Sequence, residues 1–185
     1  PDFYQSVDIA QASKSFYSFQ RIQKQFYLYR WNNDPYELFP VADKTWSRFK
    51  IMSGWSADEF CTNKPSDGVV DRLHIHHYPR GLGEQELHAD PPARQKFIQG
   101  FNLTTLGKDY YSGGLYFIQG NSARLYVDEH LTKGDGYIAY PTVIHGVEKI
   151  DCQSAPDWGM SRGRWFMGFY SMDSDLSKNK NRGWP

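Results

Sequence analysis

The chain has few cysteines, no net charge and no long apolar run. Its two cysteines, Cys61 and Cys152, are too few for a disulfide framework, and we expect free thiols, although a single bridge between them stays open. Free thiols favour a reducing, intracellular compartment. No segment is apolar enough to span a membrane, so a membrane is not an expected partner.

The balance of charge also excludes some partners. Lys plus Arg and Asp plus Glu each number 21, which gives a formal net charge of zero and a pI near 7.4. Nucleic-acid-binding proteins usually have a basic footprint, so nucleic acid is not an expected partner. The chain shows no internal repeat and no low-complexity segment, and 185 residues suit one domain, here 1–185. Nothing in the sequence indicates the oligomeric state.

Aromatic residues are abundant, at 17% of the chain, which suits strands and a ligand pocket. In the N-terminal third, apolar residues recur at near-helical spacing and predict a helix over 8–31. A turn at 32–35, a second helix over 43–52 and a polar loop over 61–68 follow. We expect 1–68 to be a helical support region.

From Val69 onward the pattern changes to strands. The segment Leu73–Tyr78 alternates, so His74, His76 and Tyr78 share one face. Further strands, separated by Gly- and Asp-containing turns, are predicted over 97–104, 113–118, 123–127, 136–140, 144–149 and 164–171. The sequence therefore predicts a mainly β fold with supporting N-terminal helices, a double-stranded β-helix or jelly roll whose catalytic core covers 69–175.

The clearest chemical signal is His88-Ala-Asp90 together with His145. Two imidazoles and one carboxylate are the ligand set that binds Fe(II) on one face and leaves the other open. His88 and Asp90 are two positions apart, so their side chains point the same way on an extended segment. His145 lies 145 − 88 = 57 residues on, far enough for a sheet to bring it back. Taken alone, the same residues could be a surface turn and a core histidine, and the neighbouring motifs favour the metal.

From Tyr78 to its end, the chain resembles the Fe(II)/2-oxoglutarate-dependent dioxygenases, most closely their prolyl-hydroxylase-like branch. Seven motifs follow the order of the family: Tyr78-Pro-Arg-Gly81, His88-Ala-Asp90-Pro91, Phe97–Thr104, Ser112–Phe117, Gly134-Asp-Gly136, His145-Gly-Val147 and Arg164–Tyr170. Each motif is weak alone, and their order makes the resemblance specific. It covers a little over half of the chain and leaves residues 1–70 without a match.

The resemblance implies Fe(II), 2-oxoglutarate and dioxygen, with His88, Asp90 and His145 as iron ligands. It gives Arg164 the salt bridge to the distal carboxylate of 2-oxoglutarate, a role that suits a planar guanidinium. Tyr78 would support the same carboxylate, and Asn102 would make a further polar contact near the metal.

The gap between the distal histidine and the arginine, 164 − 145 = 19, is about twice the family's. The segment 148–161 therefore predicts an inserted loop, and Arg162 stays an alternative to Arg164. Asp90 argues against halogenation, for which the acid is replaced by a small residue. Hydroxylation, desaturation and oxidative ring closure all stay open.

The substrate is the least determined part. His76, and then His74, are candidate substrate contacts because they share the face of Tyr78. Arg80 and Arg94 flank the metal motif and could bind an anionic group, although solvated surface arginines are common. We expect a small molecule or an amino acid. The alternatives are a prolyl or other protein side chain, a non-catalytic jelly-roll binding module, and a cupin-type oxygenase that does not use 2-oxoglutarate.

Overall fold

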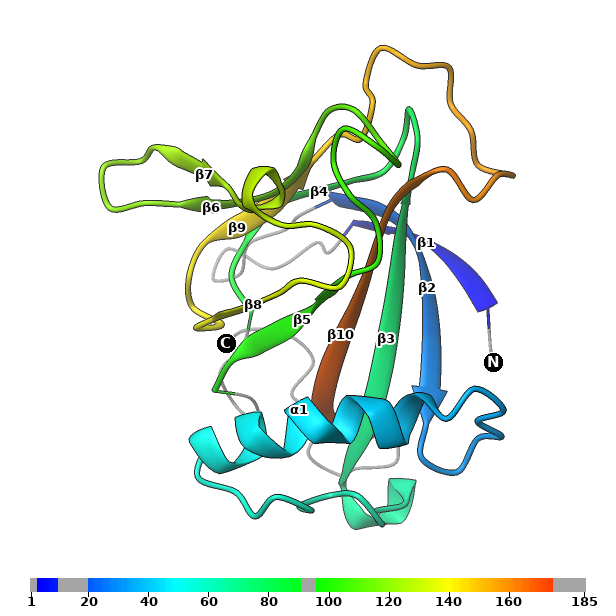
Figure 1. The fold of residues 1–185 in the computed structure, drawn as a ribbon, viewed down its shortest axis with the longest axis vertical. Coiled ribbons are helices and arrows are strands. Elements are labelled where there is room, and N and C mark those ends of the chain that lie inside the picture. The colour runs from blue at the N-terminus through cyan, green and yellow to red at the C-terminus, as the bar shows by residue number, and fades with distance from the viewer. Residues whose placement is uncertain (1–2, 10–19, 91–95, 175–185) are drawn as a thin grey trace.

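The computed structural model describes residues 3–9, 20–90 and 96–174. Their main element is an antiparallel sheet that curls on itself (Figure 1). The first layer contains β1 (Phe3–Ile9), β2 (Gln20–Tyr29), β3 (Val69–Pro79), β10 (Gly163–Asp173), β5 (Ile98–Asn102) and β8 (Gly136–Ala139). The second contains β4 (Glu84–His88), β9 (His145–Glu148), β6 (Gly114–Ile118) and β7 (Arg124–Tyr126). The strand order is β7-β6-β9-β4-β2-β3-β10-β5-β8, with β1 paired to β2, and the predicted double-stranded β-helix is confirmed.

The long pair β3 and β10 forms the centre of the first layer. The two strands pair over their whole length, from Val69 opposite Asp173 to Pro79 opposite Gly163. This register sets Arg164 opposite Tyr78 and Phe166 opposite His76. Because side chains alternate along a strand, these four residues share the inner face of the layer, which is the face toward the second layer. The predicted common face of His76 and Tyr78 is therefore confirmed.

The predicted helix over 8–31 is wrong. Residues 3–9 and 20–29 form the paired strands β1 and β2, and residues 10–19 lie outside the described part of the chain. Ile22, Phe26 and Leu28 are separated by even intervals, so a period of two explains them as well as a helical period does. Pairing with β3 and β4 decides between the two, and it aligns Phe26 with Ile75. The described part of the region 1–68 thus contains two strands, one α-helix and a short 3-10 turn, η1 (Pro65–Asp67).

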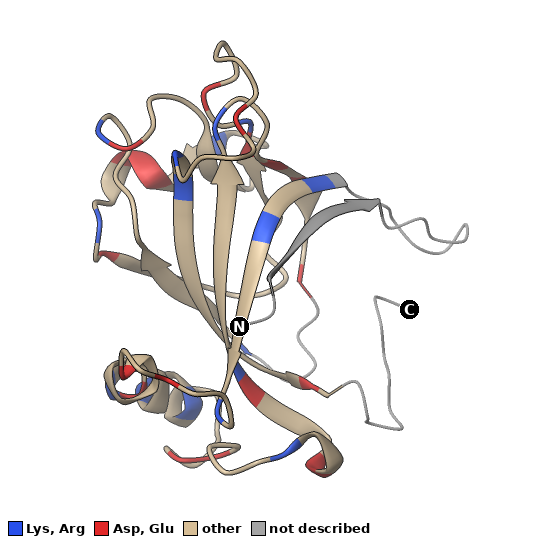
Figure 2. Ribbon diagram, turned by 90° about the vertical axis from the view of Figure 1, so that its right-hand side faces the viewer, with Lys and Arg blue, Asp and Glu red and all other residues tan. Residues whose placement is uncertain are grey.

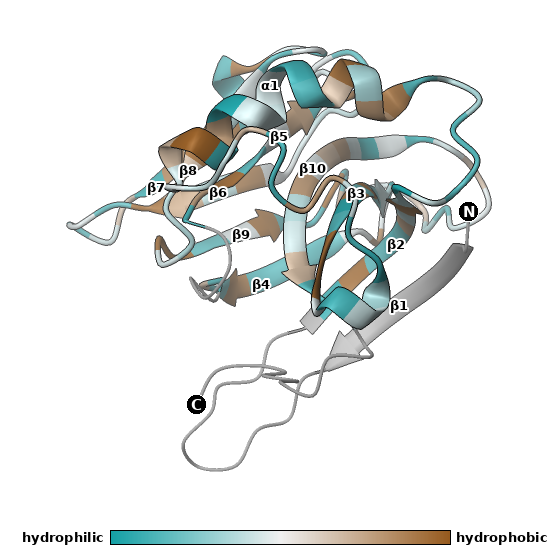
Figure 3. Cartoon of the chain, turned by 90° about the horizontal axis from the view of Figure 1, so that it is seen from below, coloured by the Kyte–Doolittle hydropathy of each residue, from teal (hydrophilic) through white to brown (hydrophobic). Residues whose placement is uncertain are grey.

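The helix predicted over 43–52 is confirmed and begins earlier, as α1 (Leu38–Met52). The Asp34 carboxylate accepts the backbone N–H groups of Leu38 and Phe39 at 3.0 and 2.9 Å, which satisfies donors that a helix start leaves free. One face of α1 packs on the outer face of the first layer, as Figures 1 and 3 show. The core there consists of Phe39, Ala42, Trp46, Leu73 and Phe169.

A second core lies between the layers and contains Tyr78, Tyr110, Leu115, Val147 and Ile150. The 3-10 turn η1 (Pro65–Asp67) lies between α1 and β3, inside the predicted loop 61–68, and η2 (Val127–His130) lies between β7 and β8. Charged residues gather in the loops and on α1, while the strands have few (Figure 2). Both cysteines are free, as expected. None of the helices in the described ranges has the length and apolar character needed to cross a membrane.

Candidate metal centre and cosubstrate site

The three predicted metal ligands meet at one point. His88 ends β4 and His145 begins β9, and the two are directly paired, with ring centroids 4.3 Å apart. Asp90 follows β4 and is tied by its backbone N–H to the Pro141 carbonyl at 2.8 Å. Its carboxylate oxygens lie 3.7 Å from His88 Nε2 and 3.8 Å from His145 Nε2. One ligand atom from each residue falls within 4.8 Å of the others, so a single ion could contact all three.

The backbone orients both imidazoles for metal binding. His88 Nδ1 lies 2.9 Å from the Glu86 carbonyl, and His145 Nδ1 lies 2.8 Å from the Val143 carbonyl. Because a carbonyl only accepts, each Nδ1 has the proton, and each Nε2 presents its lone pair toward Asp90. Burial, and then His145, lower the pKa of His88 to about 4, which favours the neutral ligand form. This donor set fits Fe(II).

Gln85 joins this centre to the rest of the barrel interior. A register irregularity in the pairing of β4 with β9 lies between Gln85 and His88, and it lets both side chains point inward although they are three positions apart. Gln85 Nε2 donates to His88 Nε2 at 2.9 Å, and its Oε1 accepts from the Tyr78 hydroxyl at 2.8 Å. Burial raises the pKa of Tyr78 to about 12, so this phenol stays protonated. No sequence pattern indicated this role of Gln85, because a regular strand would point its side chain away from that of His88.

Arg164 lies at the far end of this chain of contacts. Its guanidinium carbon is 5.8 Å from the Tyr78 ring centroid and 5.5 Å from that of Phe166. Nη2 donates to Asn102 Oδ1 at 3.2 Å, so the three residues predicted to bind the cosubstrate converge. Arg164 is 2% exposed, whereas the side chain of Arg162 is exposed on the loop before β10. Of the two arginines, only Arg164 lies inside the barrel.

Arg164 has a partner that the sequence did not reveal, Asp128 of η2. Nε and Nη2 of the arginine donate to the two carboxylate oxygens at 2.6 and 3.0 Å. Burial alone would raise the pKa of Asp128, but Arg164 and the surrounding donors outweigh burial, and the pKa lies below its usual value. The same pairing offsets the effect of burial on Arg164 and raises its pKa. In the sequence Asp128 is one acid in a polar turn, and only the fold brings it to β10.

The predicted substrate contacts have different surroundings. His76 lies on the inner face, with Nδ1 3.1 Å from Gln23 Oε1, and burial lowers its pKa to about 3. Its Nε2 is buried and has no hydrogen-bond partner among the described residues. The ring of His74 contacts the rings of Tyr27 and Tyr170 in tilted arrangements, each with its centroid 4.4 Å away.

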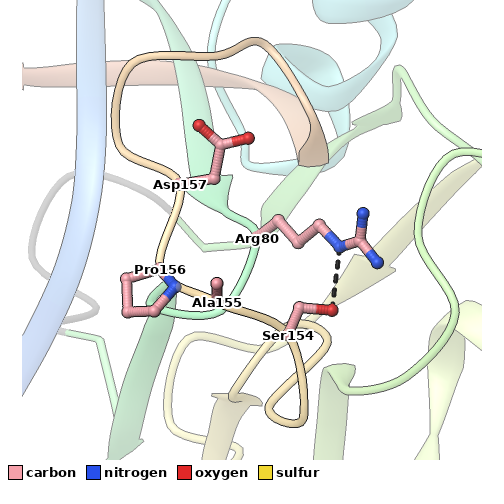
Figure 4. A pocket seen from close by; sticks show the side chains of 5 residues that line it. All are labelled: Arg80, Ser154, Ala155, Pro156 and Asp157. Atoms are coloured by element: carbon pink, nitrogen blue, oxygen red, sulfur yellow. Dashed lines mark hydrogen bonds between the residues drawn. The ribbon is translucent and has the colours of Figure 1, made fainter.

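Arg80 points to the inserted loop instead of the inner face. Its Nε donates to Ser154 Oγ at 2.9 Å and lies 3.4 Å from Asp151 Oδ2. With Ala155, Pro156 and Asp157, Arg80 and Ser154 line a surface pocket of about 370 Å³ (Figure 4). The other predicted arginine, Arg94, lies outside the described residues.

Comparison with known proteins supports the assignment of the fold. No protein-family model matches the chain, and no curated protein matches it. Among solved structures, a prolyl-4-hydroxylase from Pseudomonas putida superposes with a TM-score of 0.52 at 14% identity, covering 89% of this chain and 77% of that one. A protein from Caulobacter crescentus assigned to the 2OG-Fe(II) oxygenase family gives 0.50 at 12% identity, covering 92% of this chain and 63% of that one. The resemblance indicated by the motifs is thus confirmed for the fold, with the His-Asp-His triad in place.

Proposed function

We propose that this protein is a non-haem iron oxygenase that couples the decarboxylation of 2-oxoglutarate to oxidation of a C–H bond. The observation that supports it most strongly is the triad of His88, Asp90 and His145, in which both Nδ1 atoms are held by backbone carbonyls and both Nε2 atoms face the carboxylate. With Fe(II) and 2-oxoglutarate bound, dioxygen is reduced as 2-oxoglutarate becomes succinate and carbon dioxide, and one oxygen atom enters the substrate.

The residues of the chain provide binding, orientation and exclusion of water. The two histidines and Asp90 would hold the metal, and Arg164 at the other end of the inner face would bind the distal carboxylate of 2-oxoglutarate. The protonated hydroxyl of Tyr78 is a donor between the two ends. Because Arg164 is 2% exposed, its bonds to an anion would be little weakened by solvent.

For the substrate, we propose a small molecule or an amino acid, with hydroxylation as the outcome. Support comes from His76, whose buried Nε2 is a hydrogen-bond acceptor, since Nδ1 donates to Gln23. A compact ligand with a donor group would satisfy it. His74 is a weaker candidate, because two tyrosine rings enclose it. The second candidate is a prolyl or other protein side chain, which the likeness to a prolyl-4-hydroxylase favours.

The function is tested by anaerobic titration of the purified protein with Fe(II) and then 2-oxoglutarate, following the weak visible band of the iron-bound keto acid. We expect the band in the wild type, its loss in His145→Ala and its weakening in Arg164→Ala. His130→Ala and Arg162→Ala are matched controls, because both side chains are exposed, and they should behave as the wild type. Folded wild-type protein without the band would contradict the proposal.

The substrate class is tested separately, by succinate release with panels of amino acids, small metabolites and proline-containing peptides. Release that depends on a small molecule supports the proposed class, and release that depends only on peptides favours the second candidate. Binding of metal without any effect of 2-oxoglutarate would instead indicate a cupin-type oxygenase.

A further inference from the structure

We propose that Asp128 is a positioning residue for the cosubstrate: it occupies one edge of the Arg164 guanidinium and so leaves Nη1 to bind the distal carboxylate. The inference rests on the proposed function and deepens it, because it says which atoms of Arg164 are available. It also gives a role to a buried acid that no motif of the sequence indicated.

The first support is the pattern of bonds around the guanidinium. Arginine has five N–H donors, one on Nε and two on each terminal nitrogen. With the described residues, Arg164 makes hydrogen bonds from Nε to Asp128 and from Nη2 to Asp128 and Asn102. Its hydrogen bonds to described residues therefore use Nε and Nη2, and the two donors of Nη1 remain for a ligand.

The second support is that Asp128 is itself held from several sides. Oδ2 accepts from the Tyr110 hydroxyl and from the Leu115 backbone N–H, both at 2.8 Å, and Oδ1 accepts from Asn102 Nδ2 at 3.1 Å. Together with Arg164 Nε and Nη2, five donors converge on one carboxylate that is 3% exposed. A side chain bound at both oxygens by β5, β6, β10 and the loop before β6 cannot rotate away without losing buried hydrogen bonds, so it fixes the orientation of Arg164.

The third support is the close approach of β6 at the same place. Gly114 has φ of +121°, and a Cβ atom added to it would lie 2.4 Å from Asp128 Oδ2. A side chain at this position would displace the carboxylate. Gly114, the second glycine of the Gly113-Gly114 pair, therefore leaves room for Asp128, and through it for the observed orientation of Arg164.

Asp128 could act through its negative charge or by orienting Arg164, and the two roles predict opposite effects of Asp128→Asn on 2-oxoglutarate binding. If the carboxylate acted mainly as a negative charge near the bound cosubstrate, Asp128→Asn would strengthen the binding of anionic 2-oxoglutarate. If it orients Arg164, the same change weakens binding, because an amide nitrogen would face donors that need an acceptor. The sign of the effect thus separates the two roles.

The experiment measures dissociation constants under anaerobic conditions, in Fe(II)-loaded protein, for two keto acids. 2-Oxoglutarate has the distal carboxylate, whereas 2-oxobutyrate lacks it and cannot reach Arg164 with an anion. In Asp128→Asn we expect the dissociation constant of 2-oxoglutarate to rise about tenfold or more, and that of 2-oxobutyrate to change by less than about twofold. A role limited to stability would lower the melting temperature and leave the ratio of the two constants unchanged.

The matched control is Tyr110→Phe, which removes one buried donor from Asp128 and leaves both contacts with Arg164. We expect Tyr110→Phe to lose about as much thermal stability as Asp128→Asn does. Its dissociation constants for both keto acids should stay within about twofold of the wild-type values. Folded Asp128→Asn that binds 2-oxoglutarate equally well or more tightly would overturn the inference and leave the proposed function standing. A wild type that does not bind 2-oxoglutarate would overturn both.

If Asp128→Asn does not fold, the wild type provides the test through its arginine ¹⁵N resonances. The Nε–H signal of Arg164 is identified by its absence in Arg164→Lys, and the protein is loaded with diamagnetic Zn(II). We expect this signal to exchange slowly with water and to stay protected when 2-oxoglutarate is added. Loss of protection on addition would mean that the cosubstrate displaces Asp128, which would contradict the inference.

Discussion

Two buried ion clusters lie on opposite faces of the layer formed by β3 and β10. They differ in how many nitrogens of their arginine donate hydrogen bonds to described residues. The inner cluster consists of Asp128, Arg164, Asn102 and Tyr110, and the outer cluster of Arg30, Asp43, Lys50 and Asp71. In the outer cluster every nitrogen of Arg30 donates, to Asp43 or to Asp71. In the inner cluster the hydrogen bonds of Arg164 to described residues leave out Nη1. A saturated cluster can only support the fold, whereas one with donors in reserve can also bind a ligand.

The contacts of the outer cluster support the fold. Asp71 is fully buried and accepts from Arg30 at 2.7 Å, from Lys50 at 2.6 Å and from Ser171 at 2.8 Å. Lys50 also donates to the Glu59 carbonyl and lies 3.4 Å from Cys61 Sγ. These contacts join α1, the loop after it and the outer face of β3 and β10. We therefore expect substitutions in the outer cluster to affect stability alone, and substitution of Arg164 or Asp128 in the inner cluster to affect cosubstrate binding as well.

The largest expected effect is at the metal. Asp90→Ala removes one of the three ligands, and we expect loss of detectable Fe(II) binding and of activity. Because the Asp90 side chain is 35% exposed, the free energy of unfolding of the metal-free protein should change by less than about 1 kcal/mol. Metal titration and urea unfolding measure the two quantities. Asp58→Ala, at an exposed position, is the control; full activity in Asp90→Ala would exclude the proposed site.

The next effect is on stability, in the outer cluster. Asp71→Ala leaves Arg30 and Lys50 buried without their shared counterion, and we expect the free energy of unfolding to fall by about 3–5 kcal/mol. Urea unfolding checks the loss. In the protein that remains folded, the dissociation constant of 2-oxoglutarate should equal that of the wild type. A parallel loss of cosubstrate affinity would remove the distinction between the clusters.

Replacing the arginine of each cluster by lysine separates cosubstrate binding from structural support. Lysine keeps the charge of arginine but loses its planar fork of donors. Arg164→Lys should raise the dissociation constant of 2-oxoglutarate about tenfold or more, since bonds to the distal carboxylate are lost. Arg30→Lys should lower the free energy of unfolding and leave that constant unchanged. Calorimetric titration with 2-oxoglutarate and urea unfolding of both variants measure the two quantities. Equal effects on 2-oxoglutarate binding would contradict a binding role for Arg164 and a structural role for Arg30.

A smaller expected effect is the dependence of folding stability on pH, to which buried histidines on both faces of the layer contribute. Burial lowers the pKa of His76, on the inner face, to about 3 and that of His77, on the outer face, to about 4. Below the unfolded value of 6.5 the unfolded chain binds protons that the folded protein does not. Stability is therefore complete above pH 6.5 and falls as the pH drops toward 4, by about 1.4 kcal/mol per pH unit for each histidine.

Urea unfolding of the metal-free protein between pH 7.5 and about 4.5 measures this slope. The variant His77→Phe keeps a ring next to Trp165, on which His77 is stacked at 4.1 Å, and should reduce the slope by one histidine. A stability that does not depend on pH in this range would show that these histidines become protonated without unfolding.

The smallest effect is at Gln85. Its amide donates to the Nε2 atom of His88 that the metal would need, so it competes with the metal. Gln85→Leu should raise metal affinity about two- to tenfold, the equivalent of one hydrogen bond. Isothermal titration with Co(II) measures the change, with Gln153→Leu at an exposed position as the control. Weaker metal binding would mean that Gln85 supports His88 instead of competing for it.

Much of the barrel could be predicted because its residues repeat with a period of two and its turns contain glycine. The alternation in Leu73–Tyr78 correctly separated the inner face from the outer one, although β3 extends beyond that segment at both ends. The strands β5, β6, β7, β8, β9 and β10 all begin and end within about two residues of their predicted bounds. The segment 20–29 could not be predicted in the same way. Its apolar residues fit two periods, and pairing with β3 and β4, which a local pattern does not contain, decided for a strand.

By itself, the sequence determined the triad and the strands between residues 97 and 171, because ligand chemistry and backbone periodicity depend on residue type and spacing. Only the tertiary structure decided how these residues are oriented. The irregular pairing after Gln85 turns that side chain toward His88, and η2 brings Asp128 to Arg164 from 36 residues away. Such contacts depend on where distant segments of backbone meet, and a lone acid or amide in a polar segment has no local feature that records its partner.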